Sequence, residues 1–595
     1  MFKRIKKHIF RIGIILGILI FIGGMILNFN SVGSLIKYKN VKLKAERDDE
    51  KLVFRQGYAY KRKNVPVQVS LSGTHYEMGV QYGVLLKDEI KYMVNSLYKL
   101  ISFYSKQLKI PKDIVYIYFK FKINRLAKNY PERFKKEIQG ISDGSGVNIN
   151  AIYALSLFDD AVHSMGCTSV LAISQDGSII HGRNEDLFFG MELGMRSVII
   201  KYNPKGYNSY ESVSFPGFIG VSTGFNDKGL GYSHHSRFAN SVDLSGYPQH
   251  CISRMALEEC SSLKDVENFY KNKHVAIGDA HTWSDRNNKT GCIIETAPNK
   301  KDPVKITEMN GNAQWHINKY IDPKYIKQDE NKYTGDESFN NSRQEILNNL
   351  IKSNEKMSLD DVISILRDEN GPDGENYNLS SITRGICNID TQQMIVFDPM
   401  GKGLYIARNY YYASKSTVYF VPWDFDESPY VYKKSETIQP VLQDTAKVKE
   451  SLLSQDQIIK RLKELTVKYP NEGYIYFMIG QAYFESGKLN DWTKYIEKAY
   501  ELSSFCDKQD VTLERAKAAF YQRDMELTGK LLKDISCDGL RSFKAKAQFL
   551  YLYKMYYEKV NNKAESQKYE NKFLSLVSDK KTQGKIVKSL KAIKN

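Results

Sequence analysis

The stretch GCTSVLAISQDGSIIHGRNEDL, which begins at Gly166, carries a thiol, a cation and a carboxylate on two short β-rich runs. Cys167 starts the first run directly after a glycine, and Arg183 and Asp186 lie on the second run, behind the turn SQDGS. Runs joined by such a short turn pair as a β-hairpin, so the three residues are expected within one hairpin. A neighbouring cation stabilises a thiolate, the nucleophilic form of cysteine. The competing interpretation is a structural thiol, because free cysteine is among the most buried residue types.

A second chemistry becomes available if the chain is cut between Gly166 and Cys167. Cys167 would then carry a free α-amine, and an amine with a pKa of about 8 can act as a base near neutral pH. The nucleophile and its base would belong to one residue, and the carboxylate of Asp186 could orient the amine.

These residues resemble the N-terminal nucleophile hydrolases, and within them the group of the isopenicillin-N acyltransferases and the choloylglycine hydrolases. In that group a cysteine becomes the first residue of the chain, by self-cleavage or by removal of a leader. An arginine 16 positions later and an aspartate 19 positions later complete the local site, and Arg183 and Asp186 stand at those offsets from Cys167. The resemblance therefore implies Gly166–Cys167 as the cleavage site and all three residues as catalytic.

Further motifs extend the resemblance over roughly residues 70 to 415. GTHYEMGVQYG, from Gly73 to Gly83, is similar to the glycine-rich entry motif of the acyltransferase branch, where it lies in the pro-segment. GFNDKGLGYSHHS resembles a family turn whose following strand supplies a backbone N–H to the oxyanion hole, which implies that role for His235 or Ser236.

Two later motifs add site residues. WHINKY resembles the segment whose asparagine side chain is the other oxyanion donor, which implies that role for Asn318; Lys319 stands where the family has a histidine. SSITRG resembles a late segment that lines the site, which implies Ser381 and Arg384 as substrate-contacting residues.

The resemblance implies a two-stage reaction that needs no metal ion and no redox cofactor. Cys167 first attacks the Gly166 carbonyl, and hydrolysis of the thioester frees the new N-terminus. The mature thiolate then attacks an amide of a small-molecule N-acyl substrate and passes the acyl group to water or to an amine. Because coenzyme A thioesters are cytosolic, hydrolysis is favoured over acyl transfer for an enzyme outside the cell. The rival function is a surface scaffold with an inactive domain of this fold, whose helical tail binds a partner protein.

Patterning divides the chain into five parts. The run IGIILGILIFIGGMIL behind the basic MFKRIKKHIFR predicts a membrane anchor over 1–30, favoured over a cleaved signal peptide because no small-x-small site follows. A stalk and helical pro-segment, the small subunit, are expected over 31–166, and short β-rich runs with intervening helices over 167–432. This mixture predicts an α+β domain, and the resemblance implies a four-layer αββα sandwich. The catalytic domain is then expected outside the cytoplasm, on a single-pass membrane protein.

A linker over 433–453 precedes a helical region over 454–595. Within it, YIYFMIGQAYFESGKLNDWTKYIEKAYEL resembles a tetratricopeptide repeat, except that Trp492 stands where a small alanine normally lies. A plain helical bundle is the alternative, and a repeat would make a protein partner plausible.

Composition excludes several classes of protein. The formal charge of +18 is spread along the 595 residues without an arginine-rich arm or a zinc-finger spacing, which favours an anionic surface over nucleic acid. The seven cysteines include no CxxC pair, which argues against a disulfide scaffold and a structural zinc site. His234 and His235 are not expected to share a metal ion, because adjacent strand residues point to opposite faces.

Overall fold

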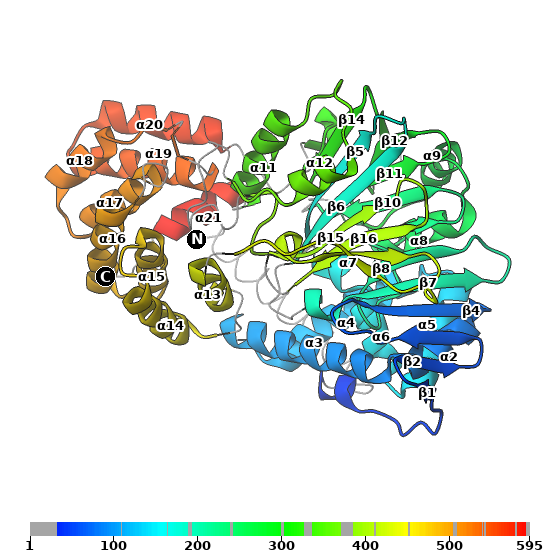
Figure 1. Ribbon diagram of the computed structural model, residues 1–595. Coiled ribbons are helices and arrows are strands. Elements are labelled where there is room, and N and C mark those ends of the chain that lie inside the picture. Colours follow the sequence, from blue (N-terminus) through cyan, green and yellow to red (C-terminus); the bar gives the residue numbers. More distant parts are fainter. Residues whose placement is uncertain are drawn as a thin grey trace, which may run out of the picture.

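Two β-sheets stacked face to face form the centre of the molecule, and a separate group of helices lies beside them (Figure 1). The computed structural model describes residues 32–590 except 109, 163–164, 188–192, 238–241, 299–302, 327–335, 371–384, 410–411, 439, 450–452, 504–507, 538, 541–542 and 578–579. The anchor predicted over 1–30 lies outside the described residues. Among the residues that are described, no helix is long and apolar enough to cross a membrane.

Sheet A has 11 strands within the described residues. In spatial order they are β1 (Glu46–Asp48), β2 (Lys51–Phe54), β3 (Gly57–Tyr60), β4 (Val67–Gly73), β7 (Val198–Pro204), β8 (Tyr210–Ser214), β9 (Thr223–Asn226), β10 (Leu230–His235), β11 (Ala280–Asp285), β12 (Thr290–Thr296) and β13 (Val304–Glu308). Every pairing is antiparallel except that of β4 with β7, which is parallel.

Sheet B has seven strands within the same residues, and all of its pairings are antiparallel. In spatial order they are β14 (Ala313–Ile317), β5 (Met165–Ile173), β6 (Ile179–Leu187), β15 (Thr391–Phe397), β16 (Gly403–Arg408), β17 (Val418–Pro422) and β18 (Tyr430–Lys433).

Alternation of side chains along the strands explains why both faces of each sheet are covered. In β15, Ile395 packs between the sheets with Ile199 of β7, whereas Met394 packs on the outer face with Val362 of α12. Both sets of positions are apolar, so each strand needs a partner on both sides.

Helices form the two outer layers (Figure 1). Sheet A is covered by α2 (His75–Leu85), α3 (Lys87–Leu108), α4 (Lys112–Ala127), α5 (Glu132–Ser145), α6 (Ile149–Ser156), α7 (Phe158–Val162), α8 (Gln249–Glu259) and α9 (Leu263–Lys271). Sheet B is covered by α11 (Asp336–Leu350) and α12 (Leu359–Leu366). The α+β class and the αββα layering expected from the sequence are confirmed.

The chain before Cys167 is built into this sandwich. Residues 31–65, expected as a stalk with a first strand, carry β1, β2 and β3, and β4 continues their sheet into β7. The strand sequences KLVF and GYAY hold enough β-branched and aromatic residues to form a hairpin, a signal that the polar surroundings obscured.

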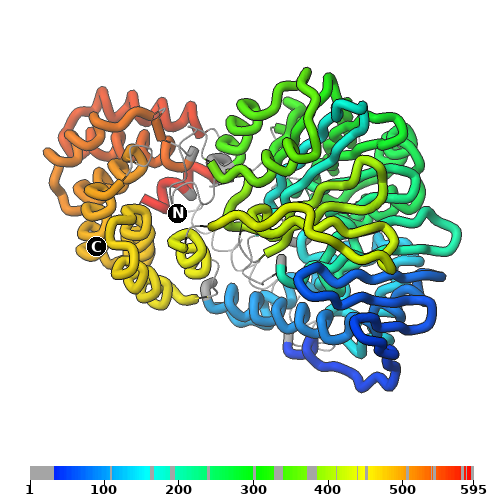
Figure 2. The backbone as a smooth tube through the Cα atoms, viewed as in Figure 1, coloured from blue at the N-terminus to red at the C-terminus, as the bar shows by residue number. Residues whose placement is uncertain are grey.

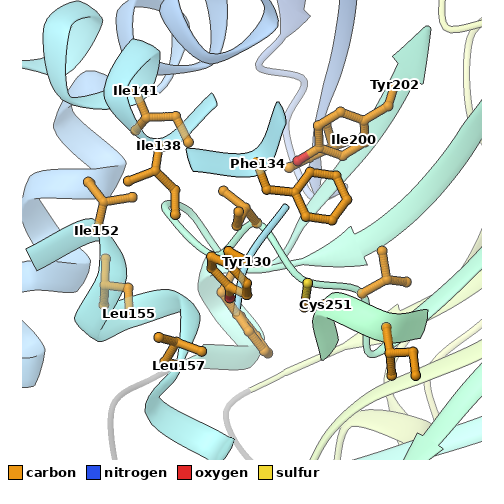
Figure 3. Close-up of a cluster of buried hydrophobic side chains, with 14 of the residues drawn as sticks. Tyr130, Phe134, Ile138, Ile141, Ile152, Leu155, Leu157, Ile200, Tyr202 and Cys251 are labelled. Atoms are coloured by element: carbon orange, nitrogen blue, oxygen red, sulfur yellow. The ribbon is translucent and has the colours of Figure 1, made fainter. Parts of the chain in front are cut away.

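The same segment also shares its hydrophobic core with the chain after Cys167. Figure 3 shows Tyr130, Phe134 and Ile138 facing Ile200, Tyr202 and Cys251, which lie on β7 and α8. A buried ion-pair network adds to this contact. The guanidinium of Arg254 lies 2.5 Å from a carboxylate oxygen of Glu137, and its Nε lies 3.1 Å from Glu258. Both sides of the predicted cleavage site therefore belong to one packed unit.

Glycines of the entry motif permit the closest helix contact in this unit. Gly79 and Gly83 of α2 face Gly140 and Gly144 of α5, which gives a small-xxx-small pattern on both helices. A Cβ atom on Gly79 would lie 2.2 Å from the carbonyl oxygen of Glu137. The motif that the resemblance singled out thus has a packing explanation.

The C-terminal helices form an arc beside the sandwich (Figure 2). They are α13 (Pro440–Lys449), α14 (Gln455–Lys468), α15 (Gly473–Glu485), α16 (Leu489–Leu502), α17 (Lys508–Tyr521), α18 (Met525–Lys533), α19 (Phe543–Lys559), α20 (Lys563–Leu576) and α21 (Lys580–Leu590). Helix α13 lies inside the expected linker. Cys387, Ile389 and Tyr412 of the sandwich join the core of α13 to α17. The helical tail expected from the sequence is confirmed; its assignment as tetratricopeptide repeats stays a prediction.

Replacement of Gly79 by alanine tests the close crossing of α2 and α5. We expect Gly79→Ala to lower the free energy of unfolding by about 2 kcal/mol, because the helices must separate to admit the methyl group. Thermal unfolding followed by near-ultraviolet circular dichroism measures the loss. Gly584→Ala is the matched control, since a Cβ there meets no atom within 4 Å. Equal stability of the Gly79→Ala protein and the wild type would contradict the proposed packing role.

Candidate active site

The β5–β6 hairpin positions the three residues that the sequence singled out. Its register pairs Gly166 with Asp186, Cys167 with Glu185, and Ser169 with Arg183. Because side chains alternate, Cys167 and Arg183 point toward sheet A, whereas Asp186 points toward the layer of α11 and α12. The offsets of 16 and 19 residues differ by an odd number, so the cation and the carboxylate approach Cys167 from opposite faces of its strand.

Arg183 holds the thiol on the inner face. Its Nη2 lies 2.9 Å from the Cys167 Sγ and donates to the carbonyl of His234 at 3.0 Å. Its Nη1 donates to the Ser222 carbonyl at 2.6 Å and to the hydroxyl of Thr223. The guanidinium is fully buried and anchored on sheet A, so it fixes the position of the sulfur.

Burial controls the protonation of the nucleophile. Desolvation raises the pKa of the Cys167 thiol to about 12, although the charge of Arg183 acts in the opposite direction. The sequence led us to expect that the cation would favour the thiolate, but in the uncut chain the burial is the larger effect. The thiol therefore needs a base to remove its proton.

Asn318 lies against the backbone of the nucleophile. The Cys167 N–H donates to the Asn318 Oδ1 at 2.7 Å, and the Asn318 Nδ2 donates to the Ser236 carbonyl at 3.0 Å. Asn318 follows β14, which pairs with β5 in the register Ile317 to Thr168. This pairing explains why a residue 151 positions from Cys167 reaches its amide.

Asp186 lies on the opposite face, beside the bond that is expected to break. Thr391 donates to its Oδ1 at 2.7 Å, and the Arg343 Nη1 lies 3.5 Å from its Oδ2. That Oδ2 is buried and has no hydrogen-bond partner among the described residues. Burial raises the pKa of Asp186, and the charge of Arg343 opposes the rise. The carboxylate is thus available to a new group that can donate hydrogen bonds.

Arg343 is the main site residue that sequence reasoning missed. From α11 its Nη1 donates to the Cys167 carbonyl at 2.6 Å and to the Thr168 hydroxyl at 2.9 Å, and its Nη2 donates to the Asn318 Oδ1 at 2.9 Å. Asn340, one turn earlier, accepts from the same Nη2 at 2.7 Å. The pair Asn340 and Arg343 at a spacing of three on one helix was the only signal available.

The residues predicted to contact the oxyanion or the substrate make other contacts or lie outside the described residues. Ser236 accepts from Asn318 through its carbonyl, as described, and its hydroxyl donates to Asp159 at 2.8 Å. The ring of His235 faces sheet B, where its Nε2 lies 2.8 Å from the Ser169 hydroxyl. The ring of His234 faces the other way, toward Asp279 at 3.0 Å. Ser381 and Arg384 lie outside the described residues. Which backbone N–H completes the oxyanion hole stays a prediction.

Lys319 departs from the family's histidine, and its contacts show what the lysine does. Its Nζ donates to Asn341 at 2.9 Å and to Gln344 at 2.7 Å, and its carbonyl accepts from Arg237. The lysine thus ties the segment after Asn318 to α11, the helix that carries Arg343.

Part of this chain is similar to known proteins. Residues 173–409, which contain Arg183, Asp186 and Asn318, match the family described as acyl-coenzyme A:6-aminopenicillanic acid acyl-transferase. Acid ceramidase of Mus musculus is 21% identical over 253 residues, which is 38% of this chain and 62% of the relative. The Dictyostelium discoideum protein dcd1B is 25% identical over 237 residues, 36% of this chain and 47% of the relative. The chain thus spans about half to two thirds of these relatives.

Two solved structures are similar to part of the chain at low sequence identity. A Caenorhabditis elegans N-acylethanolamine-hydrolyzing acid amidase ortholog is 18% identical, covers 39% of this chain and 93% of its own, and has a TM-score of 0.28. A conjugated bile acid hydrolase from Clostridium perfringens is 14% identical, covers 46% of this chain and 99% of its own, and has a TM-score of 0.27.

The layered sandwich and the cysteine at the start of its central hairpin define the class of protein, which is an N-terminal nucleophile hydrolase. Within that class, residues 173–409 are similar to the acyl-coenzyme A:6-aminopenicillanic acid acyl-transferases, and part of the chain is similar to acid ceramidase.

Replacement of Arg343 by lysine tests its contribution to the site. A lysine keeps the charge that faces Asp186 but cannot bond Asn318 and the Cys167 carbonyl together. We expect Arg343→Lys to slow cleavage at Gly166–Cys167 by about tenfold to a hundredfold, since it removes charge-assisted hydrogen bonds. The cleaved fraction is followed over time by gel electrophoresis. Arg133→Lys, which alters a half-buried arginine in an ion pair with Glu258, should process at the wild-type rate. An unchanged rate in Arg343→Lys would refute the assignment.

Proposed function

We propose that this chain is a self-processing cysteine amidohydrolase that cleaves an N-acyl amide through an acyl-thioester on Cys167. The observation that carries the proposal is the shared environment of the Cys167 amide nitrogen. Asn318 accepts its N–H at 2.7 Å, and Asp186, paired with Gly166 across the hairpin, has a carboxylate oxygen that accepts no hydrogen bond from the described residues. This environment suits an α-amine, which has more protons to donate than a peptide N–H.

Processing would begin with attack of the Cys167 sulfur on the Gly166 carbonyl carbon. The bond between that carbon and the Cys167 nitrogen breaks, and the thiol proton ends on the new amine. Water then hydrolyses the thioester and leaves a carboxylate on Gly166. Arg183 holds the sulfur 2.9 Å from its Nη2 during this exchange.

In the mature enzyme, the freed amine would take the thiol proton. The pKa of the buried thiol is about 12 in the uncut chain, so an internal base is needed near neutral pH. Asp186 would orient the amine, and Arg343 would hold the Asn318 side chain in place. The Asn318 amide would donate to the oxyanion of the substrate, a contact typically worth about 3 kcal/mol in acyl transfer.

The substrate class follows from this chemistry. The acyl group would pass to water in a hydrolase or to an amine in an acyltransferase. Both reactions would use the same four residues, Cys167, Arg183, Asp186 and Asn318. Hydrolysis is favoured if the domain lies outside the cytoplasm. Ceramide is the first substrate to test because the relatives include acid ceramidases, followed by conjugated bile acids, penicillins and N-acyl amino acids.

After cleavage the two fragments would remain associated. Strand β4 keeps seven paired positions with β7, and Arg254 keeps its buried contact with Glu137 of the smaller fragment. If residues 1–30 form the anchor, this association would hold the catalytic fragment at the membrane, outside the cytoplasm. Fractionation of cells that express the full chain, with and without residues 1–30, tests the anchor. Recovery of both forms in the soluble fraction would refute it.

The scaffold alternative, in which the helical tail binds a protein and the sandwich is inactive, is less well supported. An inactive domain has no need to bury Arg183, Arg343 and Asp186 around one cysteine, because buried charges are costly to stability.

Intact mass and N-terminal sequencing test self-processing directly. We expect two fragments from the purified wild type, the larger one starting at Cys167, and a single uncut chain from Cys167→Ala. A wild type that remains uncut under the same conditions would remove the α-amine from the mechanism.

Asn318→Ala tests the second stage. We expect hydrolysis of the best amide substrate to fall by about a hundredfold to a thousandfold in kcat, because one oxyanion donor is lost. The measurement uses chains that are already cut, so a defect in processing does not enter the rate. Asn341→Ala, which alters a neighbour of Lys319 on α11, is the matched control. A change in KM alone would argue against the oxyanion role.

A further inference from the structure

A second cluster of metal-ligating side chains lies on the other side of strand β10 from Cys167. It consists of Asp159 on α7, His234 on β10 and His250 on α8. One ligand atom from each residue lies within 4.8 Å of the others, and all three side chains are buried. The His250 Nε2 is 3.0 Å from the Asp159 Oδ2.

The second ring nitrogen of each histidine has its own acceptor. The His250 Nδ1 lies 3.2 Å from the Val221 carbonyl, and the His234 Nε2 lies 3.0 Å from the Asp279 Oδ2. A metal-bound histidine usually donates its other N–H to a carbonyl or a carboxylate, which fixes the tautomer and the ring orientation. Both histidines of this cluster follow that pattern.

The other ring nitrogen of His234, Nδ1, indicates that the cluster binds a ligand. With Nε2 donating to Asp279, Nδ1 carries the lone pair, and this buried atom has no hydrogen-bond partner among the described residues. A buried polar atom without a partner costs stability, and binding to a cation would remove that cost. The Asp159 carboxylate is also oriented, since the Ser236 hydroxyl donates to its Oδ2 at 2.8 Å.

The number and type of ligands indicate the kind of ion. Two imidazoles and one carboxylate, with no thiolate, suit zinc or another divalent transition metal rather than calcium or magnesium. Tetrahedral zinc binds these ligands at about 2.0–2.2 Å, which places ligand atoms about 3.4 Å apart. Small rotations of the three side chains would reach that spacing.

We propose that Asp159, His234 and His250 bind a divalent transition metal ion, zinc being the best fit, at a buried site separate from the nucleophile. The ring of His234 faces away from Cys167, whereas its carbonyl accepts from Arg183 at 3.0 Å. Asp159 lies before the Gly166–Cys167 bond, and both histidines lie after it. The ion would therefore join the two sides of the cleavage site and stabilise the strand that anchors Arg183. Binding does not depend on whether that bond is cut.

Metal analysis of the purified full chain tests the site. We expect about one equivalent of zinc after extensive dialysis, in line with one buried three-residue site, and strong loss of the metal in Asp159→Asn and His250→Gln. His274→Gln is the matched control, because His274 and Asp243 form a His–Asp pair at 2.8 Å that is partly exposed. The control should keep its metal.

Cobalt provides a readout that does not require a folded variant. Wild-type protein stripped with a chelator and titrated with Co²⁺ should develop the visible absorption of a low-symmetry cobalt site with one-to-one stoichiometry. Zinc should raise the melting temperature of the same stripped protein. A folded wild type that takes up no metal, shows no cobalt spectrum and gains no stability from zinc would overturn the proposal. So would zinc retained equally by Asp159→Asn and His250→Gln, which would mark the metal as adventitious.

Discussion

The pairing of β5 with β6 is the constraint on which the rest of the site depends. It places Gly166 opposite Asp186 and Cys167 opposite Glu185, so the bond expected to break lies directly beside a carboxylate. The alternation of side chains then sends the sulfur to Arg183 on one face and leaves the backbone nitrogen near Asp186 and Asn318. A shift of one residue in this register would exchange the two faces and separate the nucleophile from its cation.

Much of this arrangement could be predicted from local sequence. Short β-branched runs between turn residues indicate the strands. Cys167, Arg183 and Asp186 lie on two of these runs, which form the β5–β6 hairpin. Asn318 was reachable only through the resemblance, because nothing local links it to a residue 151 positions away. Arg343 had no such motif, and its role arises only when α11 packs on sheet B. The high pKa of the Cys167 thiol could not be predicted either, because the sequence shows the nearby cation but not how deeply the thiol is buried.

The helical tail and the site share a loop of the sandwich. Cys387 and Ile389 pack in the same core as α13 to α17. In the same segment, the Asn388 N–H donates to the Thr391 hydroxyl, and that hydroxyl donates to Asp186. The carboxylate is thus positioned by a segment whose other face is covered by the tail. This explains why the region after residue 433, which lies outside the family match, is still part of the structural support of the site.

Burial of so many charges in one place is difficult to explain by stability. Arg183, Arg343, Glu185 and Asp186 are all almost fully buried around the β5–β6 hairpin, and several of these side chains have a polar atom without a hydrogen bond among the described residues. Replacing buried ion pairs by apolar side chains is often neutral or stabilising, so packing alone would not select them. They are instead arranged around the amide and the sulfur of a single cysteine. In a dry interior, fixed charges and dipoles act strongly on a reacting centre, so under the proposed mechanism these groups would stabilise the charges that form during reaction.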